Sequence, residues 1–492
     1  MNSLVKIIVP AVSAVAAAAA GAALGVHFGY CEIEEQMKTY SVDTNGGPLR
    51  VGVISDLQLP DTLSKNTHQY RSFEKTLTML RDRGMDVLII AGDFTDVSSK
   101  KAWAHFSDIY DRVMAKVNKP VACYIMGNHD YWLADFVKAR EIPSPAKLQK
   151  RFKDFTGEYP LSHKVVNGFH FICWGSLNGN YLTCNRNKKW AREQLDIAAA
   201  DDPSKPIFVI THLNPADTAY GSDAWGNADI HEVLKDYPQA VSISGHSHYS
   251  LIDERSIWRK EYTAFTTQSL DYIELEDGKY NCSIPKTAYG DSMADKVPGC
   301  LYMLVEDDRV VCERLEANTG KALKKPWVIK APFDKPNKHT DLRQVSNTAP
   351  VFEKNMQVKF GAMTDINGNS RKFISFNAAR DDDFVHSYKL EFLDDYENVL
   401  EFIETDYDTD KPVLYNKNGE KFMPWHKSIS DARPKYISEL LYFSDFILGL
   451  DNMSKTVKLR LPNNVPENTK FIKITAVDSW NAESNPVICE IR

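Results

Sequence analysis

Short apolar runs that each end close to a potential metal ligand are the feature that most limits how this chain can fold. The first three runs and ligands are residues 51–55 with Asp56, 86–91 with Asp93, and 121–126 with Asn128. Such runs predict buried strands, and helical periodicity at 70–83 and 102–117 between them predicts a β-α-β-α-β series. Because open α/β sheets place their chemistry at the carboxyl ends of the strands, we expect the ligands to meet there.

Three later runs continue the pattern. Further strands are predicted at 170–174, 207–211 and 241–244, with a helix at 189–199 between the first two. The run at 207–211 ends at His212, and the run at 241–244 ends at Gly245-His246-Ser247-His248. Residues 301–306 and 310–315 alternate around a two-residue turn and predict a hairpin that closes the first domain.

These strand ends supply a ligand set for two metal ions. A two-metal hydrolase needs hard oxygen and nitrogen ligands that converge on two cations, with one carboxylate able to bridge them. The candidate ligands are Asp56, Gln58, Asp93, Asn128, His212, His246 and His248. Carboxylate, amide and imidazole donors suit two divalent cations of Mn, Fe or Zn rather than copper or an iron–sulfur cluster.

In order and spacing, these motifs resemble those of the calcineurin-like metallophosphoesterases. The family pattern D-x-H, G-D, G-N-H-D/E, H and G-H-x-H is matched at Asp56-Leu57-Gln58, Gly92-Asp93, Gly127-Asn128-His129-Asp130, His212 and Gly245-His246-Ser247-His248. The resemblance covers residues from about 50 to 316. It implies a four-layer α-β-β-α sandwich and hydrolysis of phosphomonoester, phosphodiester or nucleotide pyrophosphate bonds.

The resemblance also implies a role for each residue. One cation would be held by Asp56, Gln58, Asp93 and His248, and the other by Asp93, Asn128, His212 and His246. A metal-bridging hydroxide would attack phosphorus in line. His129 would protonate the leaving oxygen or stabilise the transition state, and Asp130 would orient His129.

Two positions depart from the commonest patterns. The first motif usually ends in His, whereas here it ends in Gln58, a weaker neutral ligand that could loosen one metal site, favour Mn, or mark an inactive protein. A branch that includes ADP-ribose/CDP-alcohol diphosphatase is similar in having D-x-Q, so Gln58 is compatible with catalysis. Asp96 stands where purple acid phosphatases carry the tyrosine of their iron chemistry, which is therefore not expected.

The predicted catalytic domain spans residues 48–320. Residues 321–350 are rich in proline and predict a linker. Residues 351–492 contain short alternating runs that predict an all-β sandwich. Through residues 466–480 this part resembles a fibronectin type III or Ig-like domain, which implies a spacer, docking or carbohydrate-adhesion role.

The N-terminus indicates export. Residues 7–30 are uncharged and rich in alanine, so residues 1–31 have the layout of a signal peptide and are also long enough for a membrane anchor. We therefore expect a secreted or extracytoplasmic protein, with contact to a cell-surface polymer as a further option. The formal net charge of −7 argues against specific nucleic-acid binding.

Two alternatives stay open at this point. Aromatic residues that follow the ligand motifs either line a pocket for a phosphorylated small molecule or nucleotide, or simply pack beneath loops; they are Tyr131, Trp132, Tyr220 and Trp225. The whole chain is either a phosphoesterase or a catalytically inactive surface binding protein that uses its β-sandwich. The near-complete ligand set favours the enzyme.

Overall fold

The chain forms two compact units. The computed structural model describes residues 7–11, 27–31, 33, 34, 36–132, 145–176, 185–274, 280, 281, 297–364, 370–406, 410–416, 419, 432–444 and 455–491. Of these, the first unit contains the residues up to Glu274 and from 297 to Arg343. The second contains 280, 281 and the residues from Gln344 onward.

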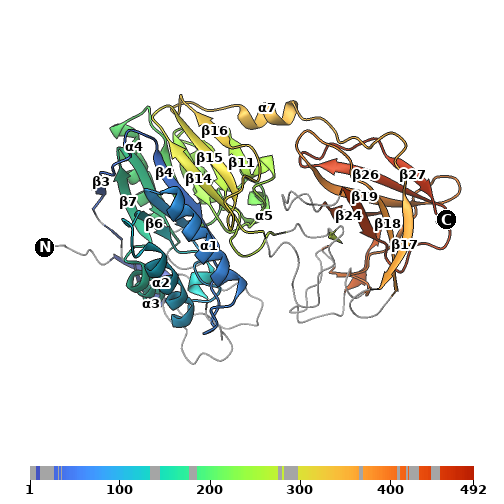
Figure 1. The fold of residues 1–492 in the computed structure, drawn as a ribbon, viewed down its shortest axis with the longest axis horizontal. Coiled ribbons are helices and arrows are strands. Elements are labelled where there is room, and N and C mark those ends of the chain that lie inside the picture. The colour runs from blue at the N-terminus through green and yellow to red at the C-terminus, as the bar shows by residue number, and fades with distance from the viewer. Residues whose placement is uncertain are drawn as a thin grey trace. The chain divides into compact units, whose positions relative to one another are not determined.

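One sheet of the first unit carries three of the predicted ligand strands. Its order is β16 (Trp327–Lys330), β15 (Arg309–Glu316), β14 (Gly299–Val305), β4 (Leu49–Ile54), β5 (Val87–Ala91) and β6 (Val121–Ile125). Strands β4, β5 and β6 are parallel, so their carboxyl ends meet at one edge. The predicted hairpin is β14 and β15, which add to this sheet in antiparallel fashion (Figure 1).

The second sheet carries the histidine strands. Its order is β11 (Ile257–Arg259), β12 (Thr263–Thr266), β10 (Ala240–Ser244), β9 (Ile207–Thr211), β8 (Phe169–Trp174), β7 (Leu161–Val166) and β3 (Lys38–Tyr40). Strands β8, β9, β10 and β12 run parallel to one another. Strands β3, β7, β11 and β12 also belong to this sheet, although the sequence pattern does not predict them.

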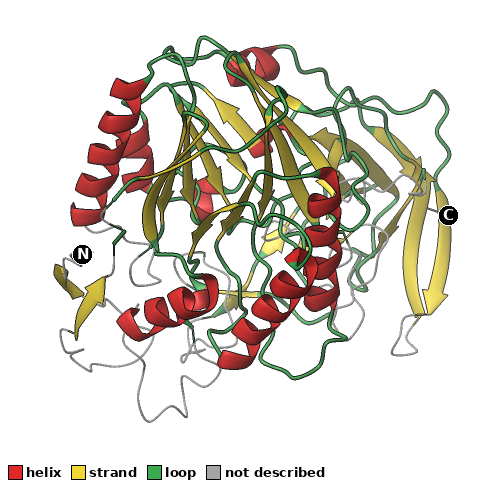
Figure 2. Cartoon of the chain, turned by 60° about the vertical axis from the view of Figure 1, so that its left-hand side comes forward, coloured by secondary structure: helices red, strands yellow, loops and turns green. Residues whose placement is uncertain are grey.

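Helices cover the outer faces of the two sheets, as Figure 2 shows. These helices are α1 (His68–Arg83), α2 (Lys100–Met114), α3 (Pro145–Thr156), α4 (Asn185–Asp201) and α6 (Ala228–Leu234). The one-turn α5 (Ser222–Trp225) and α7 (His339–Val345) lie on connecting segments. One apolar cluster lies between the sheets, a second joins the first sheet to α1, α2 and α3, and a third joins the other sheet to α4 and α6. The predicted four-layer α-β-β-α sandwich is confirmed.

Local chemistry explains why the elements begin and end where they do. Strand β5 has the sequence VLIIA and is buried at all five positions, as a central strand between two layers must be. Helix α1 begins after Thr67, whose hydroxyl accepts from the Tyr70 amide at 3.2 Å. It ends at Gly84, whose φ of 77° suits a residue without Cβ.

The first unit extends further along the chain than the predicted boundary at 320. Residues 327–330 form β16, which pairs with β15 and therefore belongs to the sheet. Trp327 and Ile329 alternate into the core, so the proline-rich segment contains a strand as well as connecting residues.

The second unit is built from antiparallel sheets. One has the order β13 (Tyr280–Asn281), β24 (Glu439–Phe443), β19 (Val385–Leu393), β26 (Phe471–Asp478) and β27 (Val487–Glu490); the other is β17 (Lys359–Thr364), β18 (Ser370–Asn377) and β25 (Thr456–Arg460). Two short pairs, β20 (Phe402–Ile403) with β23 (Tyr436–Ile437) and β21 (Leu414–Tyr415) with β22 (Arg433–Pro434), are added. A core drawn from both sheets, including Ile374, Leu390 and Ile474, is consistent with the predicted β-sandwich.

Much of the predicted signal or anchor segment lies outside the described residues. Within it, β1 (Ile7–Ala11) and β2 (His27–Cys31) pair in antiparallel fashion, and residues 12–26 are not described. In the part of the chain that the structure describes, no helix combines the length and hydrophobicity needed to cross a membrane.

Candidate metal centre

The predicted ligands gather at the carboxyl ends of strands from both sheets. Asp56, Asp93 and Asn128 follow β4, β5 and β6, while His212 follows β9, and His246 and His248 follow β10. Except for His246, which is half-buried, all of the predicted ligands are no more than 7% exposed. The two sheets thus present their ligands to a single buried region.

The backbone of this region is held in an unusual conformation. Five ligand candidates have positive φ: Asp56 (51°), Gln58 (42°), Asp93 (52°), His246 (66°) and His248 (53°). For non-glycine residues this conformation costs roughly 1–3 kcal/mol each and is concentrated at functional sites. Hydrogen bonds between the motif loops hold it, because the amides of Asp56 and Gln58 donate to the carbonyls of Gly92 and Asp93, each at 3.0 Å.

Glycine is required at two motif positions because ligand side chains lie directly against the backbone there. A Cβ at Gly127 would lie 2.1 Å from Oδ1 of Asp93, and a Cβ at Gly92 would lie 2.4 Å from Nδ1 of His212. Neither separation is sterically allowed. The glycines of the G-D and G-N-H-D motifs therefore make the room in which the ligand side chains sit.

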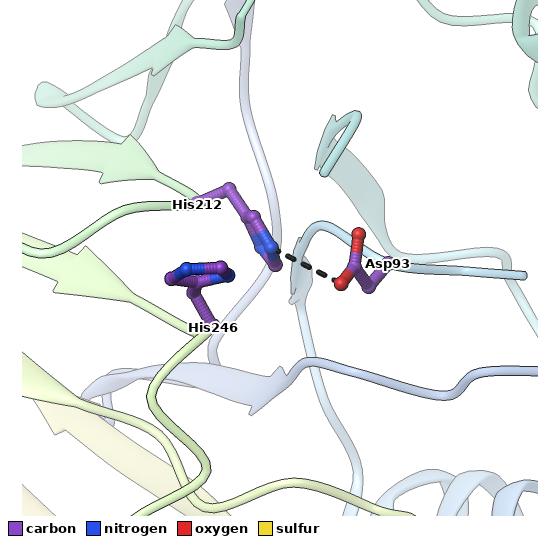
Figure 3. Close-up of side chains that lie close together, drawn as sticks. All are labelled: Asp93, His212 and His246. Carbon is purple, nitrogen blue, oxygen red and sulfur yellow. Dashed lines mark ion pairs between the residues drawn. The ribbon is translucent and has the colours of Figure 1, made fainter. Parts of the chain in front are cut away.

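Asp93, His212 and His246 form the clearest candidate site for a cation (Figure 3). One potential ligand atom from each lies within 4.8 Å of the others. Nε2 of His212 lies 3.2 Å from Oδ2 of Asp93 and 2.9 Å from Oδ1 of Asn128. Nδ1 of His212 donates to the Ala91 carbonyl at 2.8 Å, which leaves Nε2 as the ligand atom.

The two histidines of this cluster have opposite protonation tendencies. Burial lowers the pKa of His212, but the Asp93 carboxylate outweighs it and raises that pKa to about 9. Burial and the charge on His212 lower the pKa of His246 to about 3. The Asp93 carboxylate thus favours positive charge at His212, as a residue set that binds a cation would.

Asp56 and His248 form the other half of the site. Oδ1 of Asp56 lies 3.1 Å from Nε2 of His248, and Oδ2 accepts from the His246 amide at 3.1 Å and from the Ser55 hydroxyl. Burial raises the pKa of Asp56, but His248 outweighs it and holds that pKa well below its usual range. The Ser55 hydroxyl also hydrogen bonds with the Thr267 hydroxyl, so the group that holds Asp56 is itself held in place.

Gln58 lies in the same region, 4% exposed. Its backbone amide donates to the backbone carbonyl of Asp93. Within the described part of the chain, its side chain makes no hydrogen bond to another predicted ligand. The position and burial of Gln58 therefore fit the predicted ligand set.

His129 begins the one-turn helix η1 (His129–Tyr131) and points its ring at Asp93. Its Nδ1 donates to the carbonyl of Asp96 at 2.9 Å, and its Nε2 lies 4.0 Å from Oδ2 of Asp93. Burial lowers the pKa of His129, but the hydrogen bond to Asp96 and the charge of Asp93 outweigh it and raise the pKa to about 9.

Asp130 has a different place from the one that the resemblance implies. Its carboxylate accepts from the amides of Phe94 (3.2 Å), Thr95 (3.0 Å) and Gly127 (3.0 Å), and from the Thr95 hydroxyl (2.9 Å). It is fully buried and joins the G-D loop to the G-N-H-D loop. The backbone carbonyl of Asp96 orients His129 instead, because the Asp130 carboxylate is engaged by the backbone amides of the two motif loops.

The four aromatic candidates separate into two pairs. Tyr131 and Tyr220 are buried: the Tyr131 hydroxyl donates to the Ser176 carbonyl at 2.6 Å, and Tyr220 stacks on Tyr249 at 4.1 Å. Trp132 and Trp225 are 39% and 42% exposed. Only the second pair remains available to line a pocket.

Sequence reasoning missed some residues that support the site. Ser55 donates to Asp56, Thr267 hydrogen bonds with Ser55, and Tyr272 packs on His248 with ring centroids 4.3 Å apart. Ser55 directly precedes a ligand and could have been suspected on that ground. Thr267 and Tyr272 carry no motif, since only the pairing of β12 with β10 brings their segment to the site.

The residues present fit a pair of divalent cations. Two buried carboxylates, two amide oxygens and three imidazoles form a hard, mixed donor set. Nδ1 of His248 is buried and has no hydrogen-bond partner among the described residues, so that ring is not fully satisfied by protein contacts alone.

Residues 49–250 match the family model of the calcineurin-like phosphoesterases. No curated protein sequence matches the chain. Three similar solved structures are a purple acid phosphatase from yellow lupin (Lupinus luteus) seeds, a predicted phosphoesterase from Streptococcus pneumoniae, and Vacuolar Protein Sorting 29 from Cryptosporidium parvum.

The structural similarities are distant. The lupin enzyme is 10% identical, with a TM-score of 0.41 over 57% of this chain and 53% of its own, so the present chain spans about half of its length. The S. pneumoniae protein is 11% identical with a TM-score of 0.25, over 57% of this chain and 98% of its own. The C. parvum protein is 11% identical with a TM-score of 0.27, over 58% of this chain and 100% of its own.

The assignment therefore rests on the family model, together with the motif order and the buried ligand cluster. Residues 49–250 form a calcineurin-like phosphoesterase domain.

Proposed function

We propose that the first unit hydrolyses phosphomonoester, phosphodiester or nucleotide-type pyrophosphate bonds with two divalent cations. The observation that carries this proposal is the convergence of Asp93, His212 and His246 within 4.8 Å. The Asp56–His248 pair adjoins this cluster through the His246 amide. Buried charges are retained in proteins where they are paired or bind metals.

The proposed ligands form two sets, one for each cation, and Asp93 belongs to both. Asp56, Gln58, Asp93 and His248 would hold one cation, and Asp93, Asn128, His212 and His246 the other. Mn is favoured because Gln58 supplies an amide oxygen where the family usually has a histidine, and carbonyl and carboxylate oxygens suit Mn. When bound, such a pair of cations supplies an activated water and charge neutralisation for in-line displacement at phosphorus.

His129 is suited to act on the leaving group. The Asp96 carbonyl holds one proton on Nδ1, so a second proton would bind at Nε2, the nitrogen that faces Asp93 and the candidate cation sites. The raised pKa of about 9 favours that doubly protonated ring. An imidazolium so placed can donate a proton to the leaving oxygen of the ester.

We further propose export of the chain through its N-terminal segment and a fibronectin type III or Ig-like identity for the second unit. The uncharged run at 7–30 supports export. The antiparallel strands and common core of the second unit support a spacer or docking role. Cell fractionation with an epitope after Arg492 would test the first point; recovery in the cytosol alone would contradict it.

Metal content and turnover test the hydrolase proposal together. The purified chain should bind about two divalent ions per molecule and hydrolyse at least one of an aryl phosphate, a phosphodiester and ADP-ribose. Asp93→Asn should lose metal and turnover. Asp395→Asn, which changes an exposed carboxylate in the second unit, is the matched control and should retain both.

One outcome would favour the alternative. If the chain binds no metal and hydrolyses none of these esters after reconstitution with Mn, the calcineurin-like domain is inactive. The chain would then be a surface binding protein that works through its second unit.

A further inference from the structure

Three aromatic rings, each from a different loop, pack against three histidines of the site. The pairs and their ring-centroid distances are Trp132 with His129 (3.9 Å), Trp225 with His246 (5.8 Å), and Tyr272 with His248 (4.3 Å). The loops follow β6, β9 and β12. Each aromatic ring therefore borders a histidine that is either the candidate acid or a candidate ligand.

Two of these rings are exposed, although most tryptophans in the described residues are not. Trp132 and Trp225 are 39% and 42% exposed, whereas Trp103, Trp174 and Trp258 are at most 7% exposed. Single exposed apolar residues are common on protein surfaces and by themselves indicate nothing. Here, however, both exposed tryptophans lie directly beside site histidines, where a ligand would meet them.

The backbone around Trp132 is tied to the motif loops. Its amide donates to the His129 carbonyl at 3.0 Å, and its carbonyl accepts from the Ser98 amide at 2.8 Å. The ring can therefore remain near His129 without being buried. A ring held in this way is preorganised, so a ligand need not order it on binding.

The segment of Tyr272 is tied to the site on both sides. The Leu270 amide donates to the Ser55 carbonyl at 3.3 Å, and the Glu274 amide donates to the His248 carbonyl at 3.2 Å. Trp225 ends α5, where its amide donates to the Gly221 carbonyl at 2.9 Å. All three rings thus stand on backbone that is fixed by hydrogen bonds.

We propose, on the basis of the proposed hydrolase function, that Trp132 and Trp225 form a subsite for a planar aromatic group on the phosphate ester, such as a nucleoside or an aryl alcohol. Trp132 already packs on His129, tilted at an interplanar angle of 39°, and a planar group placed on the exposed part of Trp132 would lie beside the candidate acid. Stacking on tryptophan is tolerant of ring identity, because every such ring has a π face. An aliphatic alcohol has no such face.

Matched esters and single variants test the subsite. The esters are adenosine 5′-monophosphate and glycerol 3-phosphate, which share the phosphomonoester and differ in the aromatic base. The variants are Trp132→Ala, Trp132→Phe and Trp225→Ala. Tyr396→Ala removes an 80% exposed ring from the second unit and serves as the control.

The expected result is selective. Trp132→Ala should lower kcat/KM for adenosine 5′-monophosphate about tenfold, mainly through KM, while glycerol 3-phosphate changes less than about twofold. Trp132→Phe should restore most of the loss, and Trp225→Ala should show a smaller selective loss. Equal losses on both esters, or no loss on the nucleotide, would overturn the subsite.

A binding measurement separates this inference from the hydrolase proposal. In metal-free protein, adenosine 5′-monophosphate should quench tryptophan fluorescence in the wild type and in Tyr396→Ala, and less in the two Trp→Ala variants; glycerol 3-phosphate should not. If neither ester is hydrolysed, the hydrolase proposal fails for monoesters. Selective quenching then still supports the subsite, and its absence overturns it.

Discussion

Nδ1 of His129 donates a hydrogen bond to the backbone carbonyl of Asp96, 2.9 Å away, and this contact turns Nε2 of the same ring toward Asp93. The orienting group is a main-chain atom from the G-D loop. Because a carbonyl oxygen can only accept, the tautomer of His129 is determined by the fold.

The first prediction concerns His129. Substitution by Ala should lower kcat about 10²–10⁴-fold for an ester with a poor leaving group, since a positioned acid contributes that much. The loss should be smaller for an aryl phosphate, whose leaving oxygen needs less protonation. Steady-state kinetics on both esters, with metal content measured alongside, checks this. An equal loss on both esters at full metal content would contradict the assignment of His129 as acid.

The second prediction concerns Asp130. Its carboxylate accepts four hydrogen bonds in a fully buried position, so Asp130→Asn places a donor against backbone amides. We expect a loss of about 2–4 kcal/mol in the free energy of unfolding. Urea denaturation of the metal-free protein measures it. Unchanged stability with altered kinetics would instead favour a direct role for Asp130 at His129.

The third prediction concerns Gly127. Alanine here would place Cβ 2.1 Å from Oδ1 of Asp93, so Gly127→Ala should displace that ligand and abolish tight metal binding. Gly47→Ala is the control, because its nearest contact is 3.3 Å, from the Thr44 carbonyl. Metal titration by calorimetry compares the two variants. A Gly127→Ala protein that binds metal like the wild type would show that Asp93 is not a ligand.

The fourth prediction concerns pH and the buried pair His163 and His170. Nε2 of His163 lies 2.8 Å from Nδ1 of His170, and burial, aided by the charge of His170, lowers the pKa of His163 to about 4. Unfolded histidine titrates near 6.5, so between about pH 6.5 and 4 the unfolded chain binds more protons. The stability associated with neutral His163 is complete above about pH 6.5 and is lost as the pH falls, by up to about 3 kcal/mol.

Denaturation of metal-free wild type and His163→Gln at pH 7 and pH 5 measures this dependence. The variant should lose less stability than the wild type between the two pH values, because one buried group no longer titrates. His68→Gln changes a histidine elsewhere in the first unit and should behave as the wild type does. An identical pH dependence in His163→Gln and wild type would exclude the His163 contribution.

The fold of the first unit could be predicted from sequence where strands are continuous apolar runs. Strands β5 and β9 are buried at all of their residues, and such runs are easily recognised. Strand β7, with the sequence LSHKVV, is also fully buried but contains Ser162, His163 and Lys164. These polar groups are satisfied by tertiary partners, such as Gln194 for His163 and Glu158 for Lys164, which no local pattern indicates.

What the sequence alone determined is the order of the ligands and their places after strands, because strand periodicity and the motif residues are local properties. The family model matches residues 49–250, the range that contains all seven of these ligands. The tertiary structure decided which groups actually meet. In the folded chain the Asp130 carboxylate accepts from backbone amides, and the Asp96 carbonyl orients His129. Tyr272 packs against His248. These contacts depend on hydrogen bonds and strand pairings between segments far apart in the chain, so local sequence patterns do not predict them.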